Sequence, residues 1–126
     1  MKYDPLTPPE PGAWMDLDEG EQMLIVEEYH RARRIDLPNA RLHAALHAVV
    51  ESQAAMGDEL PVAATLSRLM DEGLDRHEAL HAVAAVLASH MAALQRGELP
   101  PTGDPNDAYF AELRKLTRQS WLDEWA

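Results

Sequence analysis

The sequence predicts an all-α protein, a bundle of about five helices built on a duplicated helical hairpin. Alanine is abundant, β-branched residues are sparse, and aromatic residues make up only 6% of the chain, which favours helix. Glycine and proline separate long stretches that carry apolar residues at helical spacing. The heptapeptide HAALHAV at residues 43–49 returns as HEALHAV at residues 77–83. This repetition indicates that one helical unit occurs twice.

The chain is expected to begin with an extended arm over residues 1–13, because proline at this density disfavours helix. A single helical domain over residues 14–126 follows. Its first helix is expected to start near Asp16 or Asp18 and to end near Arg34, where three arginines suit the helix C-terminus. A break at residues 37–39 separates it from a second helix, which carries the first histidine pair and stops at Gly57.

Three more helices complete the expected bundle. Pro61 opens a third helix that Gly73 ends. Asp75 is the expected N-cap of a fourth helix, which carries the second histidine pair and stops at Gly97. A loop over residues 98–106 leads to a last helix over residues 107–116, and the tryptophans of the tail are expected to dock on the bundle.

The similarity between the two histidine-bearing units extends beyond the heptapeptides. Residues 39–61 and 75–100 each contain a helix, a glycine stop, an acidic residue and a Leu-Pro pair. Duplication of a helical hairpin is the simplest explanation. Two copies are too few for a solenoid, so we expect a closed bundle.

Charge and composition exclude several classes of function. The net charge of −11 disfavours nucleic acid and anionic membranes as partners, because both need a basic surface. The chain has no cysteine, so a metal site must use nitrogen and oxygen ligands. The N-terminal segment lacks the apolar stretch of a secretory signal, and a cytoplasmic location is expected.

The paired histidines predict a metal site. His43 and His47, like His77 and His81, are four residues apart, which places both imidazoles of a pair on one face of a helix. If successive helices are antiparallel, the second and fourth helices run parallel and the pairs face each other. The four histidines could then hold one divalent transition-metal ion. Zinc is the expected ion, although imidazole also suits nickel, copper and iron.

Two glutamates near the pairs are candidate catalytic or supporting residues. Glu51 continues the stripe of His43 and His47 at the next helical turn, where it would be a ligand, an acceptor that fixes a histidine tautomer, or a solvated side chain. Residues 77–81 also satisfy the HExxH pattern, in which Glu78 would be the general base of a metal-dependent hydrolase. Glu78 equally suits the third position of a capping box with Asp75.

Two alternatives to a metal site built on the two HxxxH pairs remain. The segment from Glu27 to His30 matches half of a di-iron carboxylate motif, but the chain supplies one copy, and surface charge is the preferred interpretation. In the other alternative the chain is an interaction module that binds no metal, either as a homodimer or with another protein partner, and the histidines are inherited packing.

Residues 37–116 resemble an uncharacterised bacterial family of small helical proteins with paired HxxxH motifs. The resemblance is carried by the segment from Asn39 to His43, by His47 and Gln53, by the surroundings of the second pair, and by residues 95–97 and 107–116. It implies that the paired histidines are a family trait, and it brings no activity, because the family is known only as a domain of unknown function.

Overall fold

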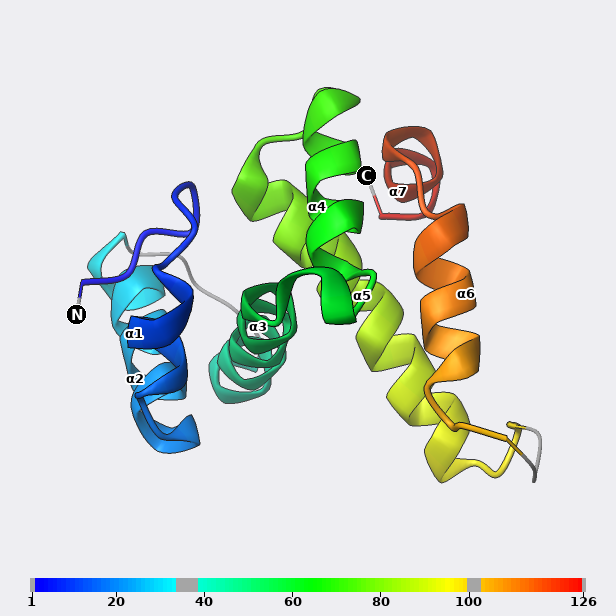
Figure 1. Cartoon of the computed structure of the whole chain (residues 1–126), viewed down its shortest axis with the longest axis horizontal. Coiled ribbons are helices and arrows are strands. Elements are labelled where there is room, and N and C mark those ends of the chain that lie inside the picture. Colours follow the sequence, from blue (N-terminus) through cyan, green and yellow to red (C-terminus); the bar gives the residue numbers. More distant parts are fainter. Residues whose placement is uncertain (1, 34–38, 100–102, 126) are drawn as a thin grey trace.

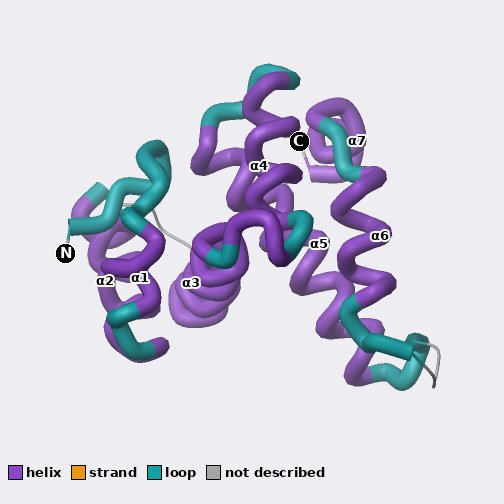
Figure 2. The backbone as a smooth tube through the Cα atoms, viewed as in Figure 1, coloured by secondary structure: helices purple, strands orange, loops and turns teal. Residues whose placement is uncertain are grey.

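The computed structural model describes residues 2–33, 39–99 and 103–125, and within these ranges the chain is helical and has no strand (Figure 2). Figure 1 shows α1 and α2 on one side, α3 in the middle, and the remaining helices on the other side. The helices are α1 (Pro11–Met15), α2 (Glu19–Ala32), α3 (Ala40–Ala55), α4 (Val62–Asp71), α5 (Arg76–Gln95), α6 (Asp107–Lys115) and α7 (Arg118–Trp125), with a short 3₁₀ helix η1 (Gly57–Glu59).

The all-α prediction is confirmed, whereas the expected number of about five helices is wrong for the described residues, which form seven α-helices. The five expected helices correspond to α2 through α6. Helix α1 begins inside the segment expected to be extended. Pro11 is tolerated in its first turn, where a missing N–H costs nothing, and the Glu10 carboxylate accepts hydrogen bonds from the N–H groups of Gly12 and Ala13. Helix α7 lies in the tail, for which no helix was predicted.

Side-chain caps fix where two of the longer helices begin. The Asp18 carboxylate accepts from the Glu21 N–H, and the Glu21 carboxylate accepts in return from the Asp18 N–H, forming a capping box at α2. At α5 the Asp75 carboxylate accepts from the Glu78 N–H at 2.8 Å, as expected for an N-cap. These caps fix the first residues of the helices that carry His30, His77 and His81.

The core consists of two apolar clusters, and α3 contributes to both. The N-terminal cluster joins the arm, α1, α2 and one face of α3, through buried residues that include Tyr3, Trp14 and Val26. The larger C-terminal cluster joins α3, α4, α5 and α6, through buried residues that include Leu69 and Leu80. The boundary between the clusters is the place where α2, α3 and α5 present their histidines.

Helices α3 and α5 cross rather than run parallel, because α3 is seen almost end-on in Figure 1 while α5 extends diagonally across the view. The expectation of parallel helices is therefore wrong, and the histidine pairs meet at the crossing. Gly57 and Gly97 follow α3 and α5 with positive φ angles of 61° and 68°, the left-handed stop that both units share. Duplication of the hairpin stays a prediction. None of the described helices has the length and apolar character needed to cross a membrane.

Candidate metal centre

Five imidazoles from three helices meet at the boundary between the two apolar clusters. His30 comes from α2, His43 and His47 from α3, and His77 and His81 from α5. The ring centroids of His77 and His81 lie 4.3 Å apart, those of His30 and His43 4.7 Å apart, and those of His43 and His81 4.8 Å apart. The structure thus brings together all four histidines of the two HxxxH pairs and adds His30.

Four of the five imidazoles form a set of donor atoms that could hold one metal ion. His30, His47, His77 and His81 each offer one ring nitrogen, and these four nitrogens all lie within 4.8 Å of one another. His43 is not part of this set. It lies at the edge of the cluster, half-buried, with its Nε2 atom 3.2 Å from Nε2 of His30. Its assignment as a ligand stays a prediction.

The hydrogen bond of His30 to its own helix determines which of its nitrogens faces the cluster. Nδ1 lies 2.9 Å from the carbonyl oxygen of Val26, and because a carbonyl only accepts, Nδ1 must carry the proton. In a neutral ring Nε2 is then the atom with the lone pair. Since His43 Nε2 is within hydrogen-bond distance of that lone pair, the His43 ring donates through its own Nε2–H.

A buried chain of hydrogen bonds orients His47. The two Nη atoms of Arg76 donate to the two carboxylate oxygens of Glu51 at 2.9 and 2.8 Å. The Tyr3 hydroxyl donates to Glu51 and lies 2.7 Å from Nε2 of His47. Burial and the Glu51 carboxylate raise the pKa of Tyr3 far above its usual range, so the phenol keeps its proton. Its single proton is used on Glu51, so His47 donates through Nε2–H and keeps its lone pair on Nδ1.

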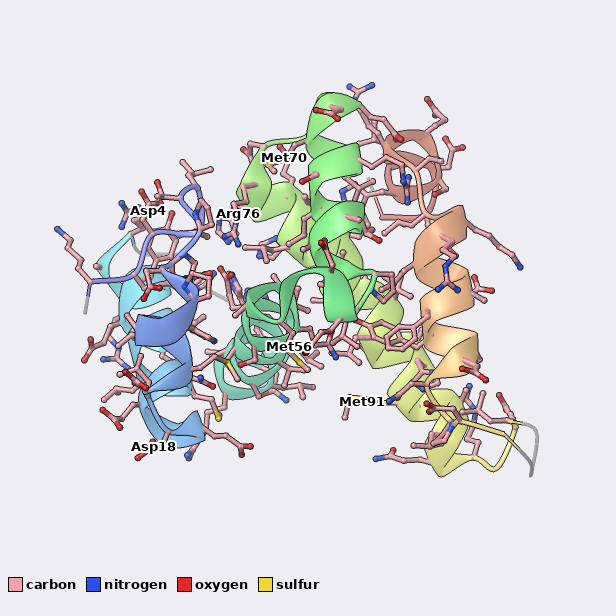
Figure 3. All side chains as sticks on the ribbon, in the orientation of Figure 1. Asp4, Asp18, Met56, Met70, Arg76 and Met91 are labelled. Atoms are coloured by element: carbon pink, nitrogen blue, oxygen red, sulfur yellow. The ribbon has the colours of Figure 1, made fainter. Side chains whose placement is uncertain are left out.

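Arg76 also ties the N-terminal arm to this chain of hydrogen bonds. Its Nη1 atom donates to the carbonyl oxygen of Pro5 at 3.0 Å, and Figure 3 shows Arg76 between the arm and the start of α5. Glu51 is 1% exposed and Arg76 is 6% exposed, so this ion pair is desolvated. A desolvated pair of this kind is strongly destabilised when one partner is removed.

Three of the cluster nitrogens are buried and have no hydrogen-bond partner among the described residues. They are Nδ1 of His47 and the Nε2 atoms of His77 and His81. Buried polar atoms of native proteins are nearly always satisfied, and each exception calls for an explanation. The His47 atom is the one to which the hydrogen-bond chain assigns a lone pair. Unprotonated nitrogens that converge on one point are the arrangement that a metal ion satisfies.

Burial also keeps these imidazoles neutral. Burial, together with the neighbouring imidazoles, lowers the pKa of His43 to about 4 and that of His81 to about 3. The same causes lower the pKa of His47 well below its usual value, and burial lowers that of His77. Neutral imidazole is the form that binds metal, so the cluster would need to release little or no proton at neutral pH.

The two candidate catalytic glutamates lie in different surroundings. Glu78 is exposed and lies outside the set of cluster donors, and its backbone N–H is held by the Asp75 cap. Glu51 is buried, but both of its oxygens accept hydrogen bonds from Arg76. Its carboxylate is therefore engaged by Arg76 and is not one of the cluster donors. Of the interpretations open for Glu51, an acceptor that fixes a histidine tautomer is the one its contacts favour, through Tyr3.

Three contributors to this site are absent from the ligand set that the sequence predicts. For His30 the sequence favours surface charge and leaves open an approach to the site from the first helix. Val26, Tyr29 and His30 are spaced on one helical face, and the structure buries all three. That spacing was the available signal. Tyr3 and Arg76 gave no local signal, because their roles depend on how the arm docks against α3 and α5.

The chain matches no protein-family model, no curated protein and no solved structure. The case for a function therefore depends on the geometry of the histidine cluster.

Proposed function

We propose that this protein binds one divalent transition-metal ion through His30, His47, His77 and His81, and that the ion joins α2, α3 and α5. The observation that carries the proposal is the set of three buried, unpartnered imidazole nitrogens that converge with the His30 lone pair. The tautomer of His47 supports it independently, because Tyr3 and Glu51 leave Nδ1 unprotonated on the cluster side. Metal-binding histidines are commonly oriented in this way by a carboxylate or another acceptor behind them.

The chemistry of the donor set favours zinc. Four neutral nitrogens suit zinc, copper and nickel and do not suit magnesium or calcium, which require oxygen ligands. Four-coordinate zinc with bonds of ~2.0–2.1 Å needs nitrogens about 3.4 Å apart, so no pair of the cluster nitrogens would need to close by more than about 1.4 Å. Rotation of the imidazole rings about their side-chain torsions supplies a movement of this size.

The position of the cluster supports a structural role for the ion. The ion would lie between the N-terminal and C-terminal apolar clusters, bonded to α2 on one side and to α5 on the other. These two helices are otherwise connected across the boundary by ring contacts such as that between Tyr29 and His77, and Arg76 joins α5 to the N-terminal arm. A metal bond here would couple the folding of the two halves. The exposure of Glu78 gives no support to a hydrolase in which it is the base.

Thermal unfolding of untagged protein, with and without a chelator, tests this proposal. We expect added zinc to raise the melting temperature in a concentration-dependent way, and a zinc concentration of 100 times Kd to add about 2.7 kcal/mol of stability. The variant His30→Ala should lose the response. The matched control His90→Ala should keep it, because His90 lies further along α5 against Tyr109. A zinc response that is equal in both variants would refute the assignment of His30.

A further inference from the structure

We infer that the groove beside the histidine cluster binds a small apolar carboxylate, one oxygen of which adds a fifth ligand to the four-histidine ion while the other accepts a hydrogen bond from His43. This inference rests on the proposed metal site, and it adds an exchangeable ligand to that site. It assigns His43 the role of a donor to the bound molecule in place of the metal-ligand role expected from the sequence.

The groove lies between α3 and α5 and has a volume of about 590 Å³. This volume is within the range of small-molecule sites. His43 and Leu46 of α3 line one wall, and residues at helical spacing on one face of α5 line the other. Ala84, Ala85 and Ala88 are part of that face, and their short side chains leave the space open.

The groove is polar at one end and mainly apolar along its length, and Ser89, eight residues after His81, is the other polar residue of its lining. His43 and His81 form the polar end, where His81 is also a cluster donor, and Trp121 contributes an aromatic wall. The seven-residue step from His81 to Ala88 corresponds to about 10 Å along the helix axis. A molecule with one polar head and a short apolar tail therefore fits the distribution of side chains.

A metal ion at the cluster would free the donor of His43. In the structure His43 donates through Nε2–H to the lone pair of His30, as the His30 bond to Val26 requires. A metal ion bonded to His30 Nε2 uses that lone pair, so the N–H of His43 then needs another acceptor. His43 lines the groove, and an oxygen atom entering there would be that acceptor.

The charge balance of the cluster favours an anionic head. The four proposed ligands are imidazoles, which bring no negative charge to the ion, and the buried carboxylate nearby, Glu51, is already neutralised by Arg76. A divalent ion in this site would keep its full charge in a largely desolvated place, where an anion is attracted strongly. A carboxylate supplies the negative charge, a metal-binding oxygen, and a second oxygen that can accept from His43.

Cobalt-substituted protein provides the test, because visible absorption of cobalt(II) reports changes in its coordination. Titration with acetate, butyrate, hexanoate and octanoate should show affinity that rises by about fourfold per methylene until the groove is filled. Hexanol, with the same tail and no charge, should leave the cobalt spectrum unchanged. Equal affinity for acetate and octanoate would overturn the role of the groove.

Two variants separate the head from the tail. Ala88→Leu should weaken hexanoate binding at least tenfold and acetate binding less than twofold, whereas Ala92→Leu, one turn further along α5, should change neither. His43→Ala should weaken every carboxylate tenfold or more while cobalt content stays at the wild-type level. Loss of cobalt in this variant would overturn the assignment of His43 as a donor.

Cobalt content also distinguishes this inference from the proposed function. Protein that binds cobalt but shows no spectral response to any carboxylate overturns the inference alone. Protein that binds no metal overturns the proposed function and, with it, the inference. If Ala88→Leu does not fold, as judged by circular dichroism, the role of the groove is decided by the wild type alone. There, carboxylate affinity should depend on the length of the alkyl tail.

Discussion

Lowering the pH from 7 to 5 should destabilise the metal-free protein, because its buried imidazoles resist protonation. The pKa of His81 falls from 6.5 in the unfolded chain to about 3 in the folded protein. Between these values the unfolded chain binds more protons than the folded one. The free energy of unfolding therefore falls as the pH drops below 6.5, and this loss levels off only near pH 3.

The size of the effect follows from the two pKa values. At pH 5 the unfolded imidazole lies about 1.5 pH units below its pKa while the folded one is still neutral. Each pH unit corresponds to about 1.36 kcal/mol. Protonation of His81 in the unfolded chain therefore lowers the free energy of unfolding by about 2 kcal/mol relative to neutral pH. Burial also lowers the pKa of His47 well below its usual value, so His47 should add a loss of stability in the same direction.

Urea unfolding at pH 7 and pH 5, with a chelator present, measures this loss. His81→Gln removes one of these titrations without breaking a hydrogen bond between described residues, since Nε2 of His81 has none there. The variant should lose about 2 kcal/mol less than the wild type between the two pH values. His90→Gln, the matched control outside the cluster, should lose as much as the wild type. An identical pH dependence in His81→Gln and the wild type would refute the reasoning.

Four further changes test the supporting residues. Glu51→Gln should cost about 3–5 kcal/mol in urea unfolding, because it leaves a buried guanidinium uncompensated, whereas Glu72→Gln, in a half-exposed pair, should cost less than about 1 kcal/mol. Tyr3→Phe should weaken zinc binding about 10- to 100-fold in a competition titration, and unchanged affinity would contradict its orienting role. Asp75→Ala should cost about 1 kcal/mol of thermal stability through loss of the α5 cap. Glu78→Gln should leave metal content within twofold of the wild type, and a loss of metal would show that this exposed side chain matters to the site.

Local signals in the sequence were sufficient for most of the fold. The glycine stops at Gly57 and Gly97 and the Asp75 cap are signals within a few residues of the helix ends they set, so α3, α4 and α5 were predicted within a few residues. Helix α1 departs from the prediction because a high density of proline generally disfavours helix, whereas Pro11 occupies the first helical turn, where proline is tolerated. Helix α7 was missed because its short segment has little apolar periodicity.

The candidate site was predictable only where its residues repeat on one helix. The HxxxH pairs stand out because both members of each pair share a helical face, so the convergence of His43, His47, His77 and His81 was expected. Tyr3 lies 44 positions from its contact with His47, and sequence spacing carries no information about such a contact. His30 was partly predictable. Apolar spacing in the sequence indicates the buried face of its helix, but whether that face points toward the other histidines depends on how α2 packs on α3.

Elemental analysis of untagged protein tests the central claim most directly. The wild type and His90→Ala should each contain one divalent transition-metal ion per chain, with zinc the expected ion. The double variant His47→Ala/His81→Ala should contain only a trace while circular dichroism still shows a helical fold. Metal content at trace level in the wild type after zinc is supplied, or one ion per chain retained in the double variant, would contradict a metal site at the meeting point of α2, α3 and α5.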